Sequence, residues 1–95
     1  MIANDKKNIM TIITKHLPSA KIYLFGSRAR GDNTPTSDID IAIDDNKKID
    51  PLILGMIRED LEESNVPFSV DVIDLHAIQH DFKEQILKDR ILWLP

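Results

Sequence analysis

Residues 38–43 read Asp-Ile-Asp-Ile-Ala-Ile, so that every second residue is an isoleucine. Because successive side chains of a β-strand point to opposite faces, this period of two predicts a strand. The isoleucines would face a buried core, while Asp38 and Asp40 would project together from the other face. The segment therefore predicts a sheet with one buried face and two neighbouring carboxylates on the opposite one.

Helical and strand patterns surround this segment. In order, they predict a helix from after Asn4 to about His16, a strand at 20–25, the strand at 38–43, a helix from Pro51 to about Ser64, a strand at 69–75, a helix over roughly 77–89 and a short closing strand at 91–94. This order is typical of one small α/β (α+β) domain, here residues 1–95, with a mixed sheet and helices packed mainly on one face. The strand at 69–75 is apolar on both faces, which predicts a central position in the sheet.

Composition excludes several classes of protein. The 95 residues include no cysteine, which excludes disulfides and thiolate metal sites. The net charge of −4 disfavours direct binding to nucleic acid. No apolar run approaches the roughly 20 residues that span a bilayer, and the N-terminus lacks the apolar core of a signal peptide. We therefore expect a cytoplasmic protein that does not associate with membranes.

A long polar loop, residues 26–37, separates the first two predicted strands. Gly26 and Ser27 open it, and glycine amides with a serine hydroxyl are suited to phosphate binding. Arg28 and Arg30 could neutralise phosphate oxygens. A P-loop is excluded, because Asp32 occupies the position that its lysine requires. The other interpretation of these residues is a glycine turn with solvated arginines.

The carboxylates suggest a metal site. Asp38 and Asp40 share one strand face, and carboxylate oxygens together with substrate phosphates are suitable ligands for Mg²⁺. Solvated acids at a strand end are the alternative interpretation. A third carboxylate should come from the strand at 69–75, where strand parity allows either Asp71 or Asp74. The pattern favours Asp71, while Asp74 could instead be the N-cap of the last helix.

Three segments together resemble a known family. They are Gly-Ser-Arg-Ala-Arg-Gly at 26–31, Ser-Asp-Ile-Asp-Ile-Ala-Ile at 37–43 and Val-Asp-Val-Ile at 70–73. This combination resembles the minimal nucleotidyltransferases (MNT) of the polymerase-β superfamily, the antitoxins of HEPN/MNT toxin–antitoxin pairs. The resemblance covers most of the chain. One departure is the last turn, where Asp89-Arg90 stand in place of a frequent glycine.

The resemblance implies both a chemistry and a set of site residues. Asp38, Asp40 and Asp71 would be catalytic and would hold two Mg²⁺ ions, and Asp71 would help to deprotonate the attacking hydroxyl. The substrate would be a nucleoside triphosphate, with ATP as the family expectation. The residues implied for nucleotide binding are Gly26, Ser27, Arg28, Arg30 and Ser37.

The resemblance also implies an acceptor. NMP would be transferred to a hydroxyl of a partner protein, and a HEPN-domain toxin is the expected partner. Two alternatives remain open from the sequence. One is a non-catalytic antitoxin that neutralises its partner by contact, and the other is transfer to a small molecule such as an aminoglycoside. A homo-oligomer is compatible with the sequence.

Overall fold

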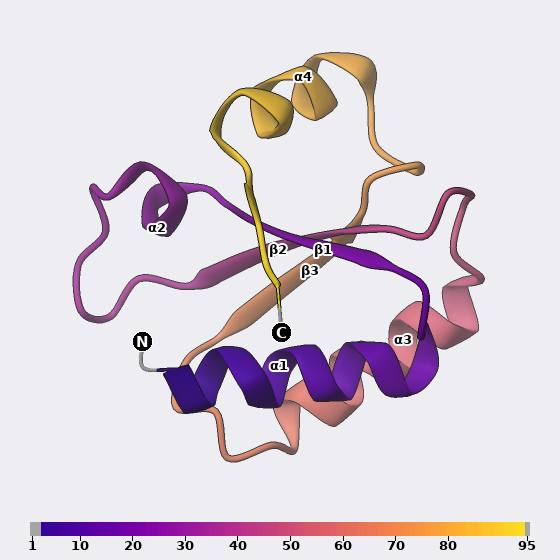
Figure 1. Cartoon of the computed structure of the whole chain (residues 1–95), viewed down its shortest axis with the longest axis horizontal. Coiled ribbons are helices and arrows are strands. Elements are labelled where there is room, and N and C mark those ends of the chain that lie inside the picture. Colours follow the sequence, from indigo (N-terminus) through magenta and orange to yellow (C-terminus); the bar gives the residue numbers. More distant parts are fainter. Residues whose placement is uncertain (1–2, 95) are drawn as a thin grey trace.

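The computed structural model describes residues 3–94, which form a four-stranded sheet with helices on both faces (Figure 1). The elements are α1 (Ala3–His16), β1 (Lys21–Phe25), α2 (Ser27–Arg30), β2 (Ile39–Asp44), α3 (Pro51–Glu62), β3 (Val70–Asp74), α4 (His80–Asp89) and β4 (Ile91–Leu92). The strand order is β3-β2-β1-β4. β2 pairs parallel to β3, whereas β1 pairs antiparallel to β2 and β4. The predicted mixed sheet of an α/β domain is therefore confirmed.

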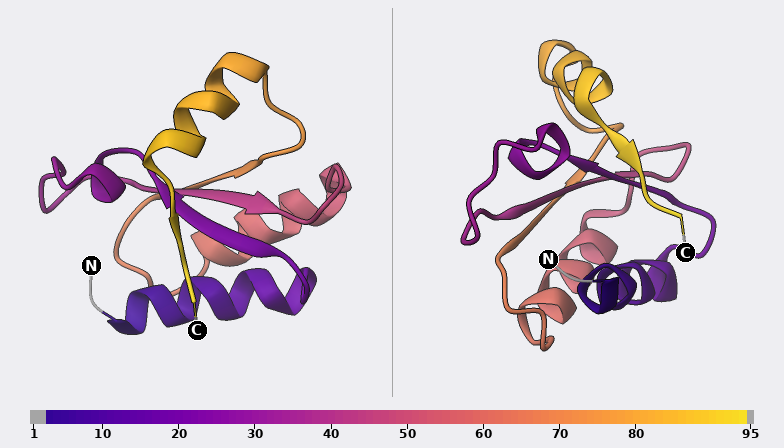
Figure 2. Two further views of the ribbon diagram at one scale, coloured as in Figure 1. Left: turned by 45° about the horizontal axis from the view of Figure 1, so that its top comes forward. Right: turned by 60° about the vertical axis from the view of Figure 1, so that its left-hand side comes forward.

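The helices divide unequally between the two faces of the sheet. α1 and α3 lie together on one face, and α4 lies across the other (Figure 2). The larger core, between the sheet and the α1–α3 layer, is built mainly from aliphatic side chains. On the opposite face, Ile86 of α4 packs in a smaller cluster with Tyr23, Phe25 and Ala42. The two long helices thus share one face, as predicted, and α4 covers only part of the other.

The alternation in β2 places its side chains as the sequence predicted. Ile39, Ile41 and Ile43 are each 0% exposed in the larger core. Asp40 and Ala42 point to the opposite face, which α4 partly covers. A one-residue shift of register would bury a carboxylate in place of an isoleucine, so the hydrophobic pattern fixes the face on which the acids lie.

The helix boundaries differ in instructive ways from those predicted. The Asp50 side chain accepts a hydrogen bond from the Leu52 amide at 2.9 Å, which confirms the predicted cap of α3. α1 begins at Ala3, ahead of the predicted start after Asn4. α4 begins only at His80 rather than near residue 77, because Asp74 holds the preceding residues in a turn.

The third strand is not central, and that prediction was wrong. β3 forms one edge of the sheet and pairs only with β2. Both of its faces nevertheless carry packed apolar side chains, since Val72 packs in the larger core and Ile73 packs against the smaller cluster. Apolar residues on both faces of β3 therefore indicate that other elements pack on both faces. They do not indicate that a second strand pairs with β3.

The predicted loop at 26–37 contains a short helix. α2 forms because the Gly26 carbonyl accepts hydrogen bonds from the amides of Ala29 and Arg30. It ends at Gly31, whose φ of 84° is left-handed, a conformation that glycine adopts without steric cost. None of the helices in residues 3–94 combines the length and apolar character that crossing a bilayer requires.

Candidate active site

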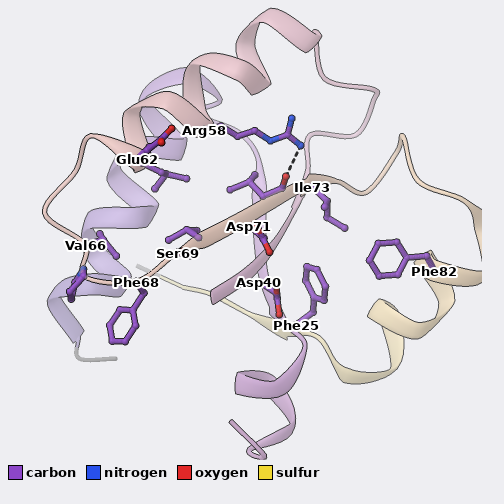
Figure 3. Close-up of a pocket in the computed structure, with 14 residues that line it drawn as sticks. Phe25, Asp40, Arg58, Glu62, Val66, Phe68, Ser69, Asp71, Ile73 and Phe82 are labelled. Atoms are coloured by element: carbon purple, nitrogen blue, oxygen red, sulfur yellow. Dashed lines mark hydrogen bonds between the residues drawn. The ribbon is translucent and has the colours of Figure 1, made fainter. Parts of the chain in front are cut away.

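The sheet register brings two acids and an aromatic ring into one row. Phe25 of β1 pairs with Asp40 of β2, and Asp40 pairs with Asp71 of β3. Paired residues of adjacent strands point to the same face, so the three side chains lie next to one another (Figure 3). Asp38 precedes the first residue of β2 and is exposed. The structure therefore gathers Asp40 and Asp71 directly, with Asp38 two residues from Asp40 along the chain.

The electrostatics of Asp40 reflect this crowding. Partial burial raises the pKa of the Asp40 carboxyl, and the negative charges of Asp71 and Asp38 raise it further. The positive charge of Arg30 acts in the opposite direction without cancelling these effects. The ionised form of Asp40 is therefore disfavoured in the folded protein, and a cation beside the three carboxylates would relieve the repulsion.

The individual acids are not drawn into one tight cluster. Within residues 3–94, no three His, Cys, Asp or Glu side chains converge closely enough to form a ready-made metal cage. The geometry instead offers carboxylates from paired positions of β2 and β3, with Asp38 beside them. This arrangement fits a cation such as Mg²⁺, which typically takes one or two protein carboxylates and completes its shell with phosphate oxygens and water.

Gly26 touches the central acid through its backbone. A Cβ atom added to Gly26 would lie 2.3 Å from the Oδ2 atom of Asp40. The backbone at Gly26 also has φ 75° and ψ −156°, a region that only glycine adopts readily. Two independent constraints therefore require glycine here: the close approach to the Asp40 carboxylate and the backbone conformation of the β1–α2 turn. Ser27 follows at the first residue of α2, within the same turn.

Arg30 is a basic side chain that lines a cavity together with Gly26. Its guanidinium contacts Asp32 at 3.2 Å and Asp89 of α4 at 3.6 Å. The hydrogen bond and charge of Asp32, followed by the charge of Asp89, raise the pKa of Arg30. Arg30 and Gly26 line a cavity of about 450 Å³ beside α4. Arg30 therefore carries its charge beside Gly26 and close enough to Asp40 to affect its pKa.

Arg28 and Ser37, both predicted to bind the nucleotide, make hydrogen bonds within residues 28–37 in the structure. The Arg28 guanidinium donates to the Ser37 carbonyl at 2.8 and 3.1 Å, and it lies 4.7 Å from the ring centroid of Phe68. The Ser37 hydroxyl accepts a hydrogen bond from the Thr34 amide at 2.9 Å. Both side chains thus hold the segment that leads into Asp38.

A cleft of about 930 Å³ opens on the β3 side of the acids (Figure 3). Asp40 and Asp71 line it together with Arg58 of α3 and with the aromatic pair Phe25 and Phe82, whose ring centroids lie 6.1 Å apart. Sequence reasoning missed Arg58 and Phe82 as parts of the site. Nothing local identifies them, because they reach the cleft from helices on opposite faces of the sheet.

Asp74, the other candidate for the third carboxylate, lies outside this cleft. Its side chain is 3% exposed and accepts hydrogen bonds from the amides of Ile49 at 2.7 Å and His76 at 2.9 Å. The suggested role as N-cap of the last helix is wrong, because α4 begins only at His80. Through these two hydrogen bonds, Asp74 instead connects the turn after β3 to the segment after β2.

Comparison with known proteins places this geometry in context. Residues 7–94 match the family described as "Polymerase beta, Nucleotidyltransferase". A probable protein adenylyltransferase of Haemophilus influenzae, MntA, is 34% identical over 80 residues, which cover 84% of this chain and 70% of that protein.

Two solved structures share the fold. One chain of a toxin–antitoxin complex crystallised with AMP-PNP superposes with a TM-score of 0.78 at 26% identity, over 95% of this chain and 73% of that chain. A chain from the complex of a tri-AMPylated Shewanella oneidensis HEPN toxin with its MNT antitoxin superposes with a TM-score of 0.76 at 24% identity, over 100% of this chain and 74% of that chain, a likeness of fold alone. The match over residues 7–94 and the relationship to MntA show that the chain belongs to the polymerase beta nucleotidyltransferase family.

Proposed function

We propose that this protein transfers AMP from ATP to a hydroxyl of a partner protein, a HEPN toxin, and so acts as its antitoxin. The observation that carries the proposal is the row formed by Asp40 and Asp71, with the Gly26 backbone against Asp40. The similarity to MntA and to a toxin–antitoxin complex with AMP-PNP supports the choice of nucleotide and acceptor.

In this proposal, each part of the site has a separate task. Gly26 and Ser27 bind the β- and γ-phosphates, and Arg30 neutralises their charge. Asp38, Asp40 and Asp71 would hold Mg²⁺, in our proposal as two ions. When bound, the metal would supply positive charge that stabilises the transferring phosphate. Arg28 and Ser37 are positioning residues, because they fix the backbone that presents Asp38.

The reaction is an in-line displacement at the α-phosphorus. The acceptor oxygen forms a bond to that phosphorus, and the bond to the pyrophosphate oxygen breaks. The hydroxyl proton passes to Asp71 or to water, and pyrophosphate leaves from the Gly26 side of the site. Asp71 is suited to accept this proton because its side chain is exposed and lines the cleft.

The test uses labelled ATP, Mg²⁺ and the product of the neighbouring reading frame. Wild-type protein should label the partner, and Asp38→Asn/Asp40→Asn should lose the label. A matched control, Glu59→Gln/Glu63→Gln, removes the same amount of charge from exposed residues on α3 and at its C-terminal end and should keep the activity. Neutralisation of the partner that survives the double aspartate substitution would instead favour an antitoxin acting by contact.

A further inference from the structure

The direction from which an acceptor approaches follows from the order of the strands. Gly26 lies at the end of β1, Asp40 on β2 and Asp71 on β3. In an in-line displacement, the attacking and leaving oxygens stand on opposite sides of the phosphorus. If the leaving pyrophosphate lies against Gly26, as the proposed function requires, the attacking hydroxyl must come from the β3 side. That side of the site is the edge of the sheet.

The hydrogen-bond ladder leaves part of this edge open. The amides of Ile39 and Leu75 bond to Ser69 and Ile43, respectively, and these two bonds fix the phase of the β2–β3 ladder. In a parallel ladder, alternate residues bond to opposite sides. The odd-numbered residues of β3 therefore form their backbone hydrogen bonds with β2. The backbone groups of Val70 and Val72 point outward, away from β2.

The outer edge is closed at one end only. Arg58 donates to the Val72 carbonyl at 2.8 Å (Figure 3). The Asp74 carbonyl accepts from the Ala77 amide at 3.0 Å. A charged side chain of this kind is one of the ways in which proteins protect a sheet edge. Around Val70, the ladder phase leaves the amide and carbonyl directed toward the cleft, and Asp71 is the next residue.

We infer that an extended, hydroxyl-bearing segment of the partner protein adds to the sheet along the outer edge of β3. A residue placed opposite Asp71 in such a strand projects from the same face as Asp71. If the strand runs antiparallel, this position lies between Val70 and Val72, whose amides point outward, and at such a non-hydrogen-bonded position Cα atoms approach to about 4.5 Å. Strand addition would therefore deliver a hydroxyl beside the acids.

The cleft fits the alternating side chains of an added strand. On the acid face it offers Ile73 and Phe82, which is 42% exposed. Beyond the edge, Val66, Pro67 and Phe68 form an apolar wall in the loop that leads into β3. In strand addition, main-chain hydrogen bonds provide affinity and pockets for alternate side chains provide specificity. A single cleft that wraps around the β3 edge supplies both.

The test substitutes the first residue of β3. Val70→Pro removes the outward amide together with the valine side chain, and proline is tolerated at the first position of an edge strand. Val70→Ala is the matched control, because it shortens the same side chain and keeps the amide. We expect kcat/KM for the partner protein to fall by about tenfold or more in Val70→Pro, as expected for one lost hydrogen bond and an obstructed edge, while the KM for ATP stays unchanged. Val70→Ala should stay within about threefold of wild type.

A second measurement does not depend on catalysis. In the complex of wild-type protein with the partner, hydrogen exchange at the amides of Val70 and Val72 should slow relative to the free protein. Unchanged exchange in a formed complex, or wild-type kcat/KM in a folded Val70→Pro variant, would overturn strand addition. The inference rests on the proposed function, and the two failures differ. Absence of labelling by wild-type protein refutes the transfer itself, whereas labelling with unprotected amides refutes only the docking mode.

Discussion

Replacing Gly26 by alanine should remove activity far out of proportion to its effect on stability. The new Cβ would lie 2.3 Å from Oδ2 of Asp40, whereas ordinary contacts begin at 3.4 Å. The carboxylate must therefore move by about 1 Å, and a misplacement of that size can cost about 100-fold in rate. The positive φ of 75° adds backbone strain of about 1–3 kcal/mol.

The other two glycines of the chain provide matched controls. Gly31 also has a positive φ, of 84°, but an added Cβ meets nothing within 4 Å. Gly31→Ala should thus cost about 1–2 kcal/mol of stability without moving an acid. Gly55 lies on an exposed position of α3 and is equally free of contacts, so Gly55→Ala should stabilise the protein by up to about 1 kcal/mol.

The assay compares the three variants side by side. AMP transfer to the partner measures activity, and urea unfolding measures stability. We expect Gly26→Ala to lose about 100-fold in kcat, and Gly31→Ala to keep activity within a few-fold at temperatures where both are folded. Equal losses in these two variants would refute the reasoning, because backbone strain alone would then explain the loss and contact with Asp40 would not matter.

Three further predictions concern the buried and paired acids. Because burial and neighbouring charges raise the pKa of Asp40, its ionised form destabilises the fold, and wild-type protein should gain stability as pH falls through that raised pKa. Without Mg²⁺ and nucleotide, Asp40→Asn should therefore melt at a higher temperature than wild type at pH 7 while being inactive, and a lower melting temperature would contradict this. Asp74→Ala should lose about 2–3 kcal/mol in urea unfolding, since it leaves the buried Ile49 amide without its acceptor; a loss below about 1 kcal/mol would show that the turn finds another partner. Burial raises the pKa of Asp44, but the hydrogen bond from His76 contributes to lowering it overall, so the Asp44 carboxyl should titrate at higher pH in His76→Ala when followed by NMR. The stability that this lowered pKa contributes to wild type should be present at neutral pH and lost as the carboxyl protonates below about pH 4.

Local pattern identified a large part of this protein. The alternation at 38–43 predicted the strand, its buried face and the opposite face for Asp40, because side-chain direction in a strand follows from position alone. The cap at Asp50 followed in the same way from neighbouring residues. The motif that begins at Gly26-Ser27 indicated the family before any tertiary contact was known.

What the pattern could not decide depends on segments that are distant in the chain. The sequence predicted Arg28 as a phosphate ligand, but it could not predict that its guanidinium donates to the Ser37 carbonyl. Asp71 and Asp74 were separated by their surroundings, since one is exposed beside Asp40 and the other is buried against the Ile49 amide. Each of these outcomes depends on a partner that periodicity does not specify.

The position of β3 shows the physical limit most clearly. The sequence at 69–75 determines that both faces of the strand are covered, because burial selects apolar side chains. It does not determine whether a second strand pairs with it, because pairing uses backbone groups that every residue carries alike. Only the tertiary structure leaves the outer backbone groups of Val70 open beside Asp71, and this open edge is where we propose that the acceptor segment binds.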